Sequence, residues 1–390
     1  MVILYVSHNY KKKGKTFTGG ASVYINRVAG ALRKFGHTPI ILSSGTQDMH
    51  YIEDGVEVFF VREPRLRLKT DYLKEPVNSL CSSFAVNRKI SELVRTRKID
   101  LIQFSSIQSV ALLYHGKIPA VMRLSSYDKL YDRDFPNKVI ANICASMQRL
   151  AAQRCTMVFA PSYVIANAFA KDIHRRVAVL ESPFWNECSE YDDSVYLSKL
   201  KGKKYVLFFG RLTIIKGVLV IADLLEQFLQ LHEEYYFVCC GIEQSGKKEN
   251  LVRSLQRGAG KHRERFLYIE ALPHSLLYPI VKQADFVICP SYIENLSNTC
   301  MEAMYFERVV IGTDGASYEQ LINDGENGLL CMPEDSGSLL GKMNQAAAMD
   351  EAQKEEMGKK ARQRIDRLAP EIMIRKLERL YQYVIEHTKR

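Results

Sequence analysis

The chain has 390 residues, which suits two domains with a core each, and its composition of 47% hydrophobic and 25% charged residues excludes a disordered protein. No apolar run reaches the roughly 18 residues that a membrane-spanning helix needs. The net charge of +10 is unevenly placed: residues 1–200 hold 28 lysines and arginines against 18 aspartates and glutamates, whereas residues 201–390 hold 26 of each. This asymmetry suggests that the first half faces an anionic partner or surface.

The N-terminal stretch MVILYVSHNY has no basic region before its apolar residues, so we expect a first strand and not a signal peptide. The protein is therefore expected in the cytoplasm. The nine cysteines are scattered and show no C-x-x-C spacing, which favours buried free thiols over disulfides or a metal site.

In residues 1–185, short β-rich runs alternate with helical patterns, which predicts parallel strands joined by crossover helices. The expected strands are VILYVS, HTPIILS, VEVFFV, DLIQFS, PAVMRL, MVFAPS and VAVLESP. After the first of them, ASVYINRVAGALRKFG has apolar residues at helical spacing and ends at Gly36, which favours a glycine C-terminal cap. We expect a Rossmann-like N-terminal domain.

Residues 186–203 are polar and aperiodic, and we interpret them as a linker. The pattern restarts in residues 204–370, where YVLFFG, YYFVCCG, RFLYIEA, DFVICPS and RVVIGTDG are the expected strands. Residues 371–390 are expected to form a last helix that packs back towards the N-terminal domain. The predicted fold class is α/β, with two Rossmann-like doubly wound parallel-sheet domains facing each other across a cleft, and ligands are expected beyond the carboxyl ends of the strands.

The segment PSYIENLSNTCMEAM places Glu294 and Glu302 eight positions apart. Glu294 lies beyond a strand, and SNTCMEAMYF begins a helix whose free N–H groups can bind a phosphate. Glu302 is expected in the first turn, so that the two carboxylates grip sugar hydroxyls on either side of a diphosphate. There is a simpler alternative for each: Thr299 and Glu302 form the T-x-x-E of a capping box, and Glu294 is a solvated loop acid.

Two further segments fit the same chemistry. FFGRLTIIKGV places Arg211 and Lys216 just past the first strand of the second half, where two cations can neutralise the charge that builds on a leaving diphosphate; a basic surface turn is the alternative. In TFTGGASVYI, Gly19 and Gly20 allow a backbone N–H to approach a phosphate or an acceptor, although a plain turn explains them too. The pattern is not G-x-G-x-x-G, which disfavours a dehydrogenase.

The E-x7-E segment, with AMYFERVVIGTDGASYEQLINDGENGLL around and after its second glutamate, resembles the retaining glycosyltransferases of family four, which have the GT-B fold. The resemblance implies that Glu294 contacts the transferred sugar and Glu302 the ribose hydroxyls of the nucleotide. It also implies that Arg211 and Lys216 bind the donor β-phosphate. The residues between the two glutamates are expected to bind substrate as well: Asn295, Leu296, Ser297, Asn298 and Thr299.

In the resembling family, the first domain binds the acceptor, and the glycine loop of Gly19 and Gly20 lines the active site. Many members carry a histidine after the strand that reads PAVMRLSSYD here, but this chain has Ser125 and Ser126 at that place, preceded by Arg123. These three residues are expected to bind substrate, and the role of the histidine cannot be transferred.

The predicted activity is transfer of a sugar from a nucleotide diphosphate donor, expected to be a UDP-sugar, to an acceptor hydroxyl with retained anomeric configuration. No cofactor and no metal ion are expected. Asp132-Arg133-Asp134 is a D-x-D, the metal-binding pattern of the other large glycosyltransferase fold, but a solvated loop explains it, and the two cations make a divalent ion redundant.

The basic segments YKKKGK, REPRLRLK and VNRKISELVRTRK are each explained by a solvated face. Together they favour peripheral association with anionic lipid on the inner side of the membrane, and a glycan or lipid-linked acceptor as in surface polysaccharide assembly. Two alternatives remain: a non-catalytic relative that binds nucleotide-sugar, and a basic nucleic-acid-binding protein. Since no nucleic-acid motif or interleaved aromatic residues accompany the charge, no nucleic acid is expected as a partner.

Overall fold

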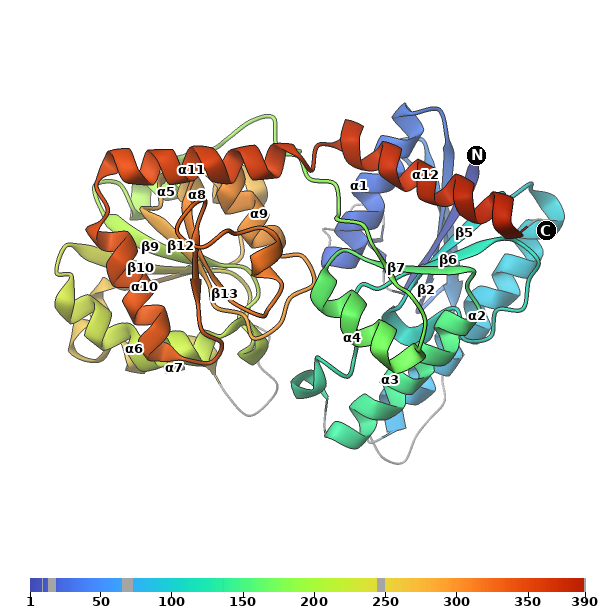
Figure 1. Ribbon diagram of the computed structural model, residues 1–390, viewed down its shortest axis with the longest axis horizontal. Helices are drawn as coiled ribbons and strands as arrows, with labels where there is room; N and C mark the ends of the chain where they lie inside the picture. Colours follow the sequence, from blue (N-terminus) through green and yellow to red (C-terminus); the bar gives the residue numbers. More distant parts are fainter. Residues whose placement is uncertain (9, 13–18, 65–72, 136, 244–249, 389–390) are drawn as a thin grey trace. The chain divides into compact units, whose positions relative to one another are not determined.

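A computed structural model describes residues 1–8, 10–12, 19–64, 73–135, 137–243 and 250–388 (Figure 1). The chain divides into two compact units, residues 1–183 with 370–390 and residues 184–369. Each unit is a mostly parallel sheet with helices on both faces (Figure 1). The predicted α/β class with two Rossmann-like parallel-sheet domains is confirmed.

The first unit contains an eight-stranded sheet in the order β3-β4-β2-β1-β5-β6-β7-β8. Only β3 and β4 are antiparallel to each other. The chain places β2 on one side of β1 and β5 on the other, so the topological switch point lies at the carboxyl end of β1. The strands are β1 (Val2–His8), β2 (Thr38–Gly45), β3 (Met49–Glu53), β4 (Val56–Arg62), β5 (Leu101–Ser105), β6 (Ala120–Arg123), β7 (Met157–Ala160) and β8 (Ala178–Val179).

The helices of this unit lie on both faces of the sheet. They are α1 (Gly20–Lys34), α2 (Lys74–Thr96), α3 (Lys138–Gln153), α4 (Tyr163–Ile173) and α12 (Pro370–Thr388), with one-turn 3-10 helices η2 (Ile107–Ser109) and η3 (Asp132–Asp134). Helix α1 packs against α12, and α2 packs against α3. Right-handed crossovers in opposite directions place α1 on one face and α2 and α3 on the other. Gly36, after α1, has φ +81°, as its predicted capping role requires.

The C-terminal helix α12 buries one apolar stripe, which includes Leu377, Tyr381 and Val384. The Tyr381 hydroxyl lies 2.8 Å from the Tyr5 hydroxyl of β1 and donates to Gln103 of β5 at 2.6 Å. These bonds join segments that are almost the whole chain apart in sequence, and the structure groups α12 with the N-terminal strands for this reason.

The second unit contains a six-stranded, fully parallel sheet in the order β11-β10-β9-β12-β13-β14. Its strands are β9 (Lys204–Phe209), β10 (Tyr235–Cys240), β11 (Phe266–Ile269), β12 (Phe286–Cys289), β13 (Val309–Thr313) and β14 (Leu329–Cys331). Its helices are α5 (Ser194–Lys199), α6 (Val218–Leu231), α7 (Leu251–Gly258), α8 (His274–Gln283), α9 (Asn298–Tyr305), α10 (Ser336–Ala348) and α11 (Glu351–Asp366), with 3-10 helices η4 (Ile214–Lys216), η5 (Gly260–Arg265) and η6 (Tyr318–Gln320). Residues 186–203, expected as a linker, contain α5 and are grouped with this unit.

The central strands were predicted from continuous apolar runs, because a strand covered by helices on both faces is buried on both faces. Two strands were not predicted. Strand β3 has no fully buried residue, and β14 is only three residues long, so neither produces the apolar run that the central strands show.

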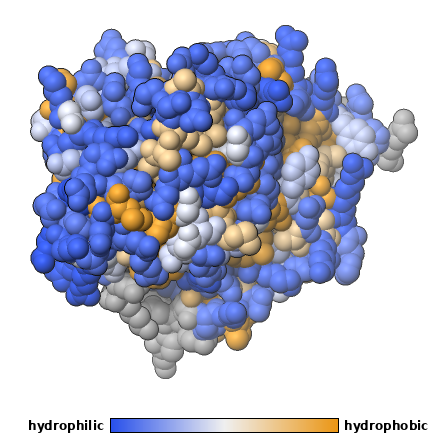
Figure 2. Space-filling model, turned by 60° about the vertical axis from the view of Figure 1, so that its left-hand side comes forward, coloured by the Kyte–Doolittle hydropathy of each residue, from blue (hydrophilic) through white to orange (hydrophobic). Residues whose placement is uncertain are grey.

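The nine cysteines are all unpaired, as predicted; eight are buried and Cys188 is half-buried. Among the described residues, no helix is both long and apolar enough to cross a membrane. The face drawn in Figure 2 is mostly hydrophilic, with apolar side chains in separate groups.

One buried ion pair ties α11 to the sheet of the second unit. Lys354 Nζ lies 2.8 Å from both carboxylate oxygens of Asp285, and the two side chains are 9% and 11% exposed. The Tyr235 hydroxyl donates to the same carboxylate. Because removing the lysine would leave a buried carboxylate without its cation, we expect Lys354→Met to lower the free energy of unfolding by about 3 kcal/mol in urea denaturation.

The double variant Lys354→Met/Asp285→Asn removes both charges and is the matched control. It is expected to recover most of the lost stability, since the remaining amide can still accept from Tyr235. Equal denaturation midpoints for the single and double variants would contradict the importance of the unpaired charge.

Candidate active site

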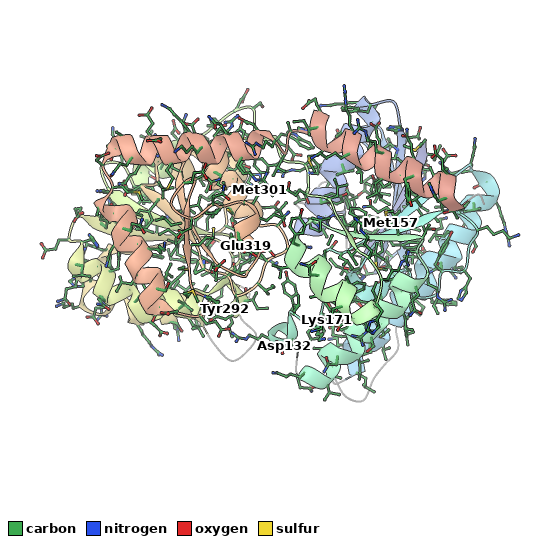
Figure 3. The ribbon with its side chains drawn as sticks, viewed as in Figure 1. Asp132, Met157, Lys171, Tyr292, Met301 and Glu319 are labelled. Carbon is green, nitrogen blue, oxygen red and sulfur yellow. The ribbon has the colours of Figure 1, made fainter. Side chains whose placement is uncertain are left out.

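The candidate site of the second unit lies at its topological switch point. Strand β9 has β10 on one side and β12 on the other, and ligands of open parallel sheets bind beyond the carboxyl ends of such strands. Two loops begin there, residues 210–217 after β9 and residues 290–297 after β12. The Tyr292 N–H donates to the Ile215 carbonyl at 2.8 Å and joins them; Figure 3 labels Tyr292 on the second loop and Met301 on the helix that follows it.

The two loops approach each other at Gly217. This glycine has φ +76°, and a Cβ added to it would lie 2.0 Å from the Pro290 carbonyl oxygen. No other residue type fits this backbone conformation and this distance. The close approach brings the end of the first loop against the start of the second.

Lys216 and Glu294, one from each loop, form an ion pair between Nζ and Oε1. Their side chains are 22% and 13% exposed. The Ser291 hydroxyl donates to the same Glu294 oxygen at 3.2 Å. It accepts in turn from the Tyr318 hydroxyl at 3.0 Å. The Ser317 hydroxyl donates to the Glu294 backbone carbonyl at 2.8 Å. The carboxylate of Glu294 is therefore held by contacts with its neighbours and is not a freely solvated loop acid.

Glu302 occupies a different place from the one expected. It is the fifth residue of α9 (Asn298–Tyr305), not a member of its first turn. The alternative of a Thr299–Glu302 capping box does not hold either, because Ser297 is the N-cap and its hydroxyl accepts the Cys300 N–H at 3.3 Å. Counted from Ser297, Glu302 falls in the second turn of the helix.

The Glu302 side chain is only 8% exposed and has a histidine beside it that the sequence analysis missed. His274 Nε2, at the start of α8, lies 3.6 Å from Glu302 Oε1. The imidazole stacks on the Tyr278 ring, with centroids 4.7 Å apart. The only sequence indication of this contact is that His274 follows the strand RFLYIEA, whose carboxyl end faces the same edge of the sheet.

The other predicted donor residues differ in exposure. Arg211 follows Gly210 directly and its side chain is exposed, unlike that of Lys216. Between the glutamates, Asn295 and Ser297 are buried, whereas Leu296, Asn298 and Thr299 are half-buried. The structure thus brings Lys216 and Glu294 into direct contact and leaves the guanidinium of Arg211 at the surface.

Cys289, the last residue of β12, lies under this site, with its Sγ 3.8 Å from the Thr299 hydroxyl. Burial raises the pKa of its thiol to about 12. A thiol with that pKa stays protonated at neutral pH and is a poor nucleophile.

In the first unit, Gly19 is the N-cap residue of α1 and Gly20 its first residue. A Cβ at Gly19 would meet no atom within 4 Å in the described part of the chain. Among the described residues, the first turn of α1 contains no acidic side chain, and its N-cap, a glycine, provides no side-chain cap.

Arg123 is the last residue of β6, and Ser125 and Ser126 follow the strand. Arg123 is buried, and burial lowers the pKa of its guanidinium. Its Nη atoms donate to the Ser125 hydroxyl at 3.1 Å and the Ser182 hydroxyl at 2.8 Å, and the guanidinium lies 3.7 Å from the centroid of the Tyr24 ring. The side chains of Ser125 and Ser126 are half-buried.

A second cluster in the first unit was not predicted. His8, at the carboxyl end of β1, places Nδ1 3.0 Å from the Ser44 hydroxyl and 3.0 Å from Glu63 Oε1. The Ser82 hydroxyl also donates to Glu63, and hydrogen bonds from His8 and Ser82 lower the pKa of that carboxyl despite its burial. The four residues come from three strand ends and α2, so no local sequence pattern predicts them.

Asp132, the first residue of the D-x-D, lies in the one-turn helix η3 (Figure 3). The Lys138 Nζ lies 3.7 Å from Asp132 Oδ2. Within the described ranges, no group of three or more histidine, cysteine, aspartate or glutamate side chains has the arrangement of a metal site.

Two known protein families match parts of this chain. The family described as Glycosyl transferases group 1 matches residues 193–364, and the one described as Glycosyltransferase Family 4 matches residues 18–182. The two matches lie side by side, span most of the chain and support a glycosyltransferase. Spore coat protein SA of Bacillus subtilis is 26% identical over 134 residues, which are 34% of this chain and 36% of that protein. The chain thus matches only about a third of the length of this relative.

Solved structures share the whole fold. Sucrose-phosphate synthase of Thermosynechococcus elongatus superposes with a TM-score of 0.78 at 14% identity, over 99% of both chains. The Anabaena protein HepE, in a structure with UDP and glucose, has a TM-score of 0.74 at 16% identity, over 98% of this chain and 100% of that one. At such identities the likeness shows the common glycosyltransferase fold.

Proposed function

We propose that the chain transfers a sugar from a nucleotide diphosphate donor to an acceptor hydroxyl, with retained anomeric configuration and without a metal ion. The observation that carries the proposal is the Lys216–Glu294 ion pair at the switch point, beside a helix that carries Glu302. The cation near the start of α9 can bind the charged diphosphate of a nucleotide-sugar. The two carboxylates can accept hydrogen bonds from its neutral hydroxyls.

The diphosphate is proposed to bind at the start of α9, where backbone N–H groups favour an anion. Lys216 would exchange its contact with Glu294 for the β-phosphate, and the exposed Arg211 would add a second positive charge. Glu294, released from the lysine, would accept hydrogen bonds from the hydroxyls of the transferred sugar. Glu302 would accept from the ribose hydroxyls, with His274 holding the carboxylate in place.

For the reaction, the bond between the anomeric carbon and the β-phosphate oxygen breaks, and the acceptor oxygen forms a bond to the same carbon on the same face. The acceptor proton passes to the leaving phosphate. Lys216 and Arg211 stabilise the negative charge that builds on that phosphate. The Cys289 thiol is buried and stays protonated at neutral pH, so it does not act as a nucleophile in this step.

UDP is the proposed nucleotide, and the UDP-containing structure of the HepE fold relative supports this choice. The first unit is proposed to bind the acceptor through Gly19, Gly20, Arg123, Ser125 and Ser126. For the acceptor we propose a glycan or lipid-linked molecule, reached at the inner face of a membrane. The surplus of positive charge in the first half of the chain supports an anionic surface as a partner.

Calorimetric titration of UDP, GDP and ADP, each with and without EDTA, tests the donor site. We expect UDP to bind in EDTA and Glu302→Ala to weaken binding at least tenfold, because a hydrogen bond to a charged acceptor contributes about 1.5–3 kcal/mol. Glu264→Ala, at an exposed glutamate of the same unit, should bind UDP normally. Absence of nucleotide binding would refute the proposal, and loss of turnover in EDTA would refute its metal-free part.

A further inference from the structure

Helices α2 and α3 of the first unit expose large apolar side chains in a regular pattern. On α2, Leu80 is 45% exposed and Phe84 54%; on α3, Val139 is 63%, Ile143 37% and Leu150 51% exposed. The spacings of four and seven residues place the members of each set on one side of their helix. Each helix therefore has an apolar stripe that faces away from its own sheet.

The buried sides of the same helices contain both small and large residues. Helix α2 buries Ser79, Ser82, Ser83 and Ala85 but also Val86, Ile90 and Leu93, and α3 buries Ile140 beside Ala141, Ala145, Ala151 and Ala152. An ordinary amphipathic helix places its large apolar residues inside and its small or polar ones outside. Leu80 and Phe84 lie on the side of α2 opposite the buried Val86 and Leu93, so they form a second apolar side that folding does not require, which indicates an apolar partner.

The two stripes belong to one surface. Helices α2 and α3 pack against each other on the same face of the sheet (Figure 1). Both run back from the carboxyl edge of the sheet, because α2 follows the strand β4 and α3 follows β6. Their first halves, which carry Phe84 and Ile143, therefore lie towards the edge at which ligands of parallel sheets bind.

Positive charge continues the α2 stripe. Arg88 and Arg95 follow Phe84 on the same side of the helix, and neither makes an ion pair within the described part of the chain. Both line a cavity of about 870 Å³ between α2 and the β3–β4 edge, together with Lys89. Glu92 and Asp48 also line it, but Glu92 pairs with Lys89 at 2.6 Å, and Asp48 accepts the Arg62 N–H at 2.9 Å.

We propose that the α2–α3 surface, defined by Leu80, Phe84, Val139, Ile143 and Leu150 with Arg88 and Arg95, docks onto an anionic lipid bilayer. The apolar side chains enter the acyl boundary, and the arginines contact lipid phosphates.

The charges of the two units favour a bilayer over a second copy of this chain as the partner of the α2–α3 surface. The first unit has 32 lysines and arginines against 17 aspartates and glutamates, a surplus of 15, whereas the second unit has 22 against 27. Two copies of a cationic surface repel each other, and an anionic bilayer attracts both its apolar and its cationic parts. The proposal extends the proposed function by giving the surface that would bring the acceptor-binding unit to a lipid-linked acceptor.

The test is co-sedimentation of the full chain with vesicles of phosphatidylcholine alone or mixed with phosphatidylglycerol, at low and high salt. We expect binding to the anionic vesicles, weakened by salt. Leu80→Ser/Phe84→Ser and Arg88→Glu/Arg95→Glu should each lower the partition coefficient at least tenfold, because each buried apolar group and each surface charge contributes about fivefold or more.

Two control variants match these changes elsewhere. Leu231→Ser/Ile372→Ser removes exposed apolar residues from α6 and α12, and Arg253→Glu/Arg257→Glu reverses two exposed charges on α7. Both should bind vesicles as the unaltered protein does. Val139→Ser/Ile143→Ser is a second apolar variant, on α3 instead of α2. If circular dichroism shows that one apolar variant is misfolded, the other still tests the surface.

Four results would overturn the proposal: no vesicle binding by the unaltered protein, equal loss in the control variants, normal binding by both apolar variants, or a change of oligomeric state in place of vesicle binding. None of these measurements needs nucleotide or acceptor. Failure of lipid binding with intact UDP binding would thus refute the docking surface alone, and the reverse would refute the proposed donor site alone.

Discussion

Replacing Glu294 with glutamine is expected to lower kcat about a thousandfold, the upper range for losing one preorganised polar group at a reacting centre. Glutamine keeps the shape of the side chain, so its contact with Ser291 can persist. The change removes the negative charge that we place beside the transferred sugar, where positive charge builds as the bond to phosphate breaks. The measurement is the initial rate of UDP release from a UDP-sugar, with acceptor where one is known and by hydrolysis otherwise.

The control for this experiment is Glu264→Gln, at an exposed glutamate of the same unit. It should leave kcat unchanged, and the melting temperatures of both variants should lie close to that of the unaltered protein. Near-normal turnover by Glu294→Gln would refute the assignment of this carboxylate to the donor sugar.

Lys216 allows a sharper version of the same experiment. Because Lys216 and Glu294 are in direct contact, Lys216→Met and Glu294→Gln should each be harmful, and the double variant should lose less than the product of the two effects. If Lys216 acts instead only as a surface cation, the two losses will multiply.

The position of the two loops, residues 210–217 and 290–297, could be predicted from the sequence because it depends on the order of the strands. YVLFFG and DFVICPS are continuous apolar runs, and the segments after them carry the glycines and polar residues of loops. In a parallel sheet both loops must open at the same edge. The pairing of Lys216 with Glu294 is thus a consequence of topology, although the two residues are 78 positions apart.

The details that were missed depend on tertiary contacts. Ser297 and Thr299 are both good N-cap residues, and the sequence alone cannot decide which one begins α9. His274 reaches Glu302 only because α8 and α9 start at the same edge of the sheet. Likewise, the hydrogen bond of Arg123 to Ser182 and its contact with the Tyr24 ring join residues far apart in the sequence, so no local pattern predicts them.

Helix α2 shows a further limit of sequence patterns. VNRKISELVRTRK was interpreted as a basic face, and it does form the second half of the helix. Leu80 and Phe84 precede it, and their period fits an inward-facing stripe as well as an outward-facing one. The structure buries Val86, Ile90 and Leu93 instead and leaves Leu80 and Phe84 on the opposite side of the helix. Of the other two basic segments, YKKKGK and REPRLRLK, most residues lie outside the described part of the chain.

Gly217→Ala is expected to damage both the stability and the activity of the protein. The new Cβ would lie 2.0 Å from the Pro290 carbonyl oxygen, in a backbone conformation with φ +76°. Positive φ costs about 1 kcal/mol for alanine, and the overpacking adds about 2 kcal/mol, so the free energy of unfolding should fall by about 3 kcal/mol. To relieve the clash, the loop of Lys216 must move away from the loop of Glu294, and kcat/KM should fall at least a hundredfold.

Gly202→Ala separates the two causes. Gly202 also has positive φ, +78°, but an added Cβ there meets nothing within 4 Å among the described residues. This variant should lose about 1 kcal/mol in urea denaturation and keep its activity, because it carries the backbone cost without the clash. If both variants lose the same stability and both stay active, the close approach of the two loops does not hold the ion pair in place. If only Gly217→Ala loses activity, the contact between Gly217 and Pro290 is what positions Lys216 against Glu294, and the donor site depends on a distance that only glycine permits.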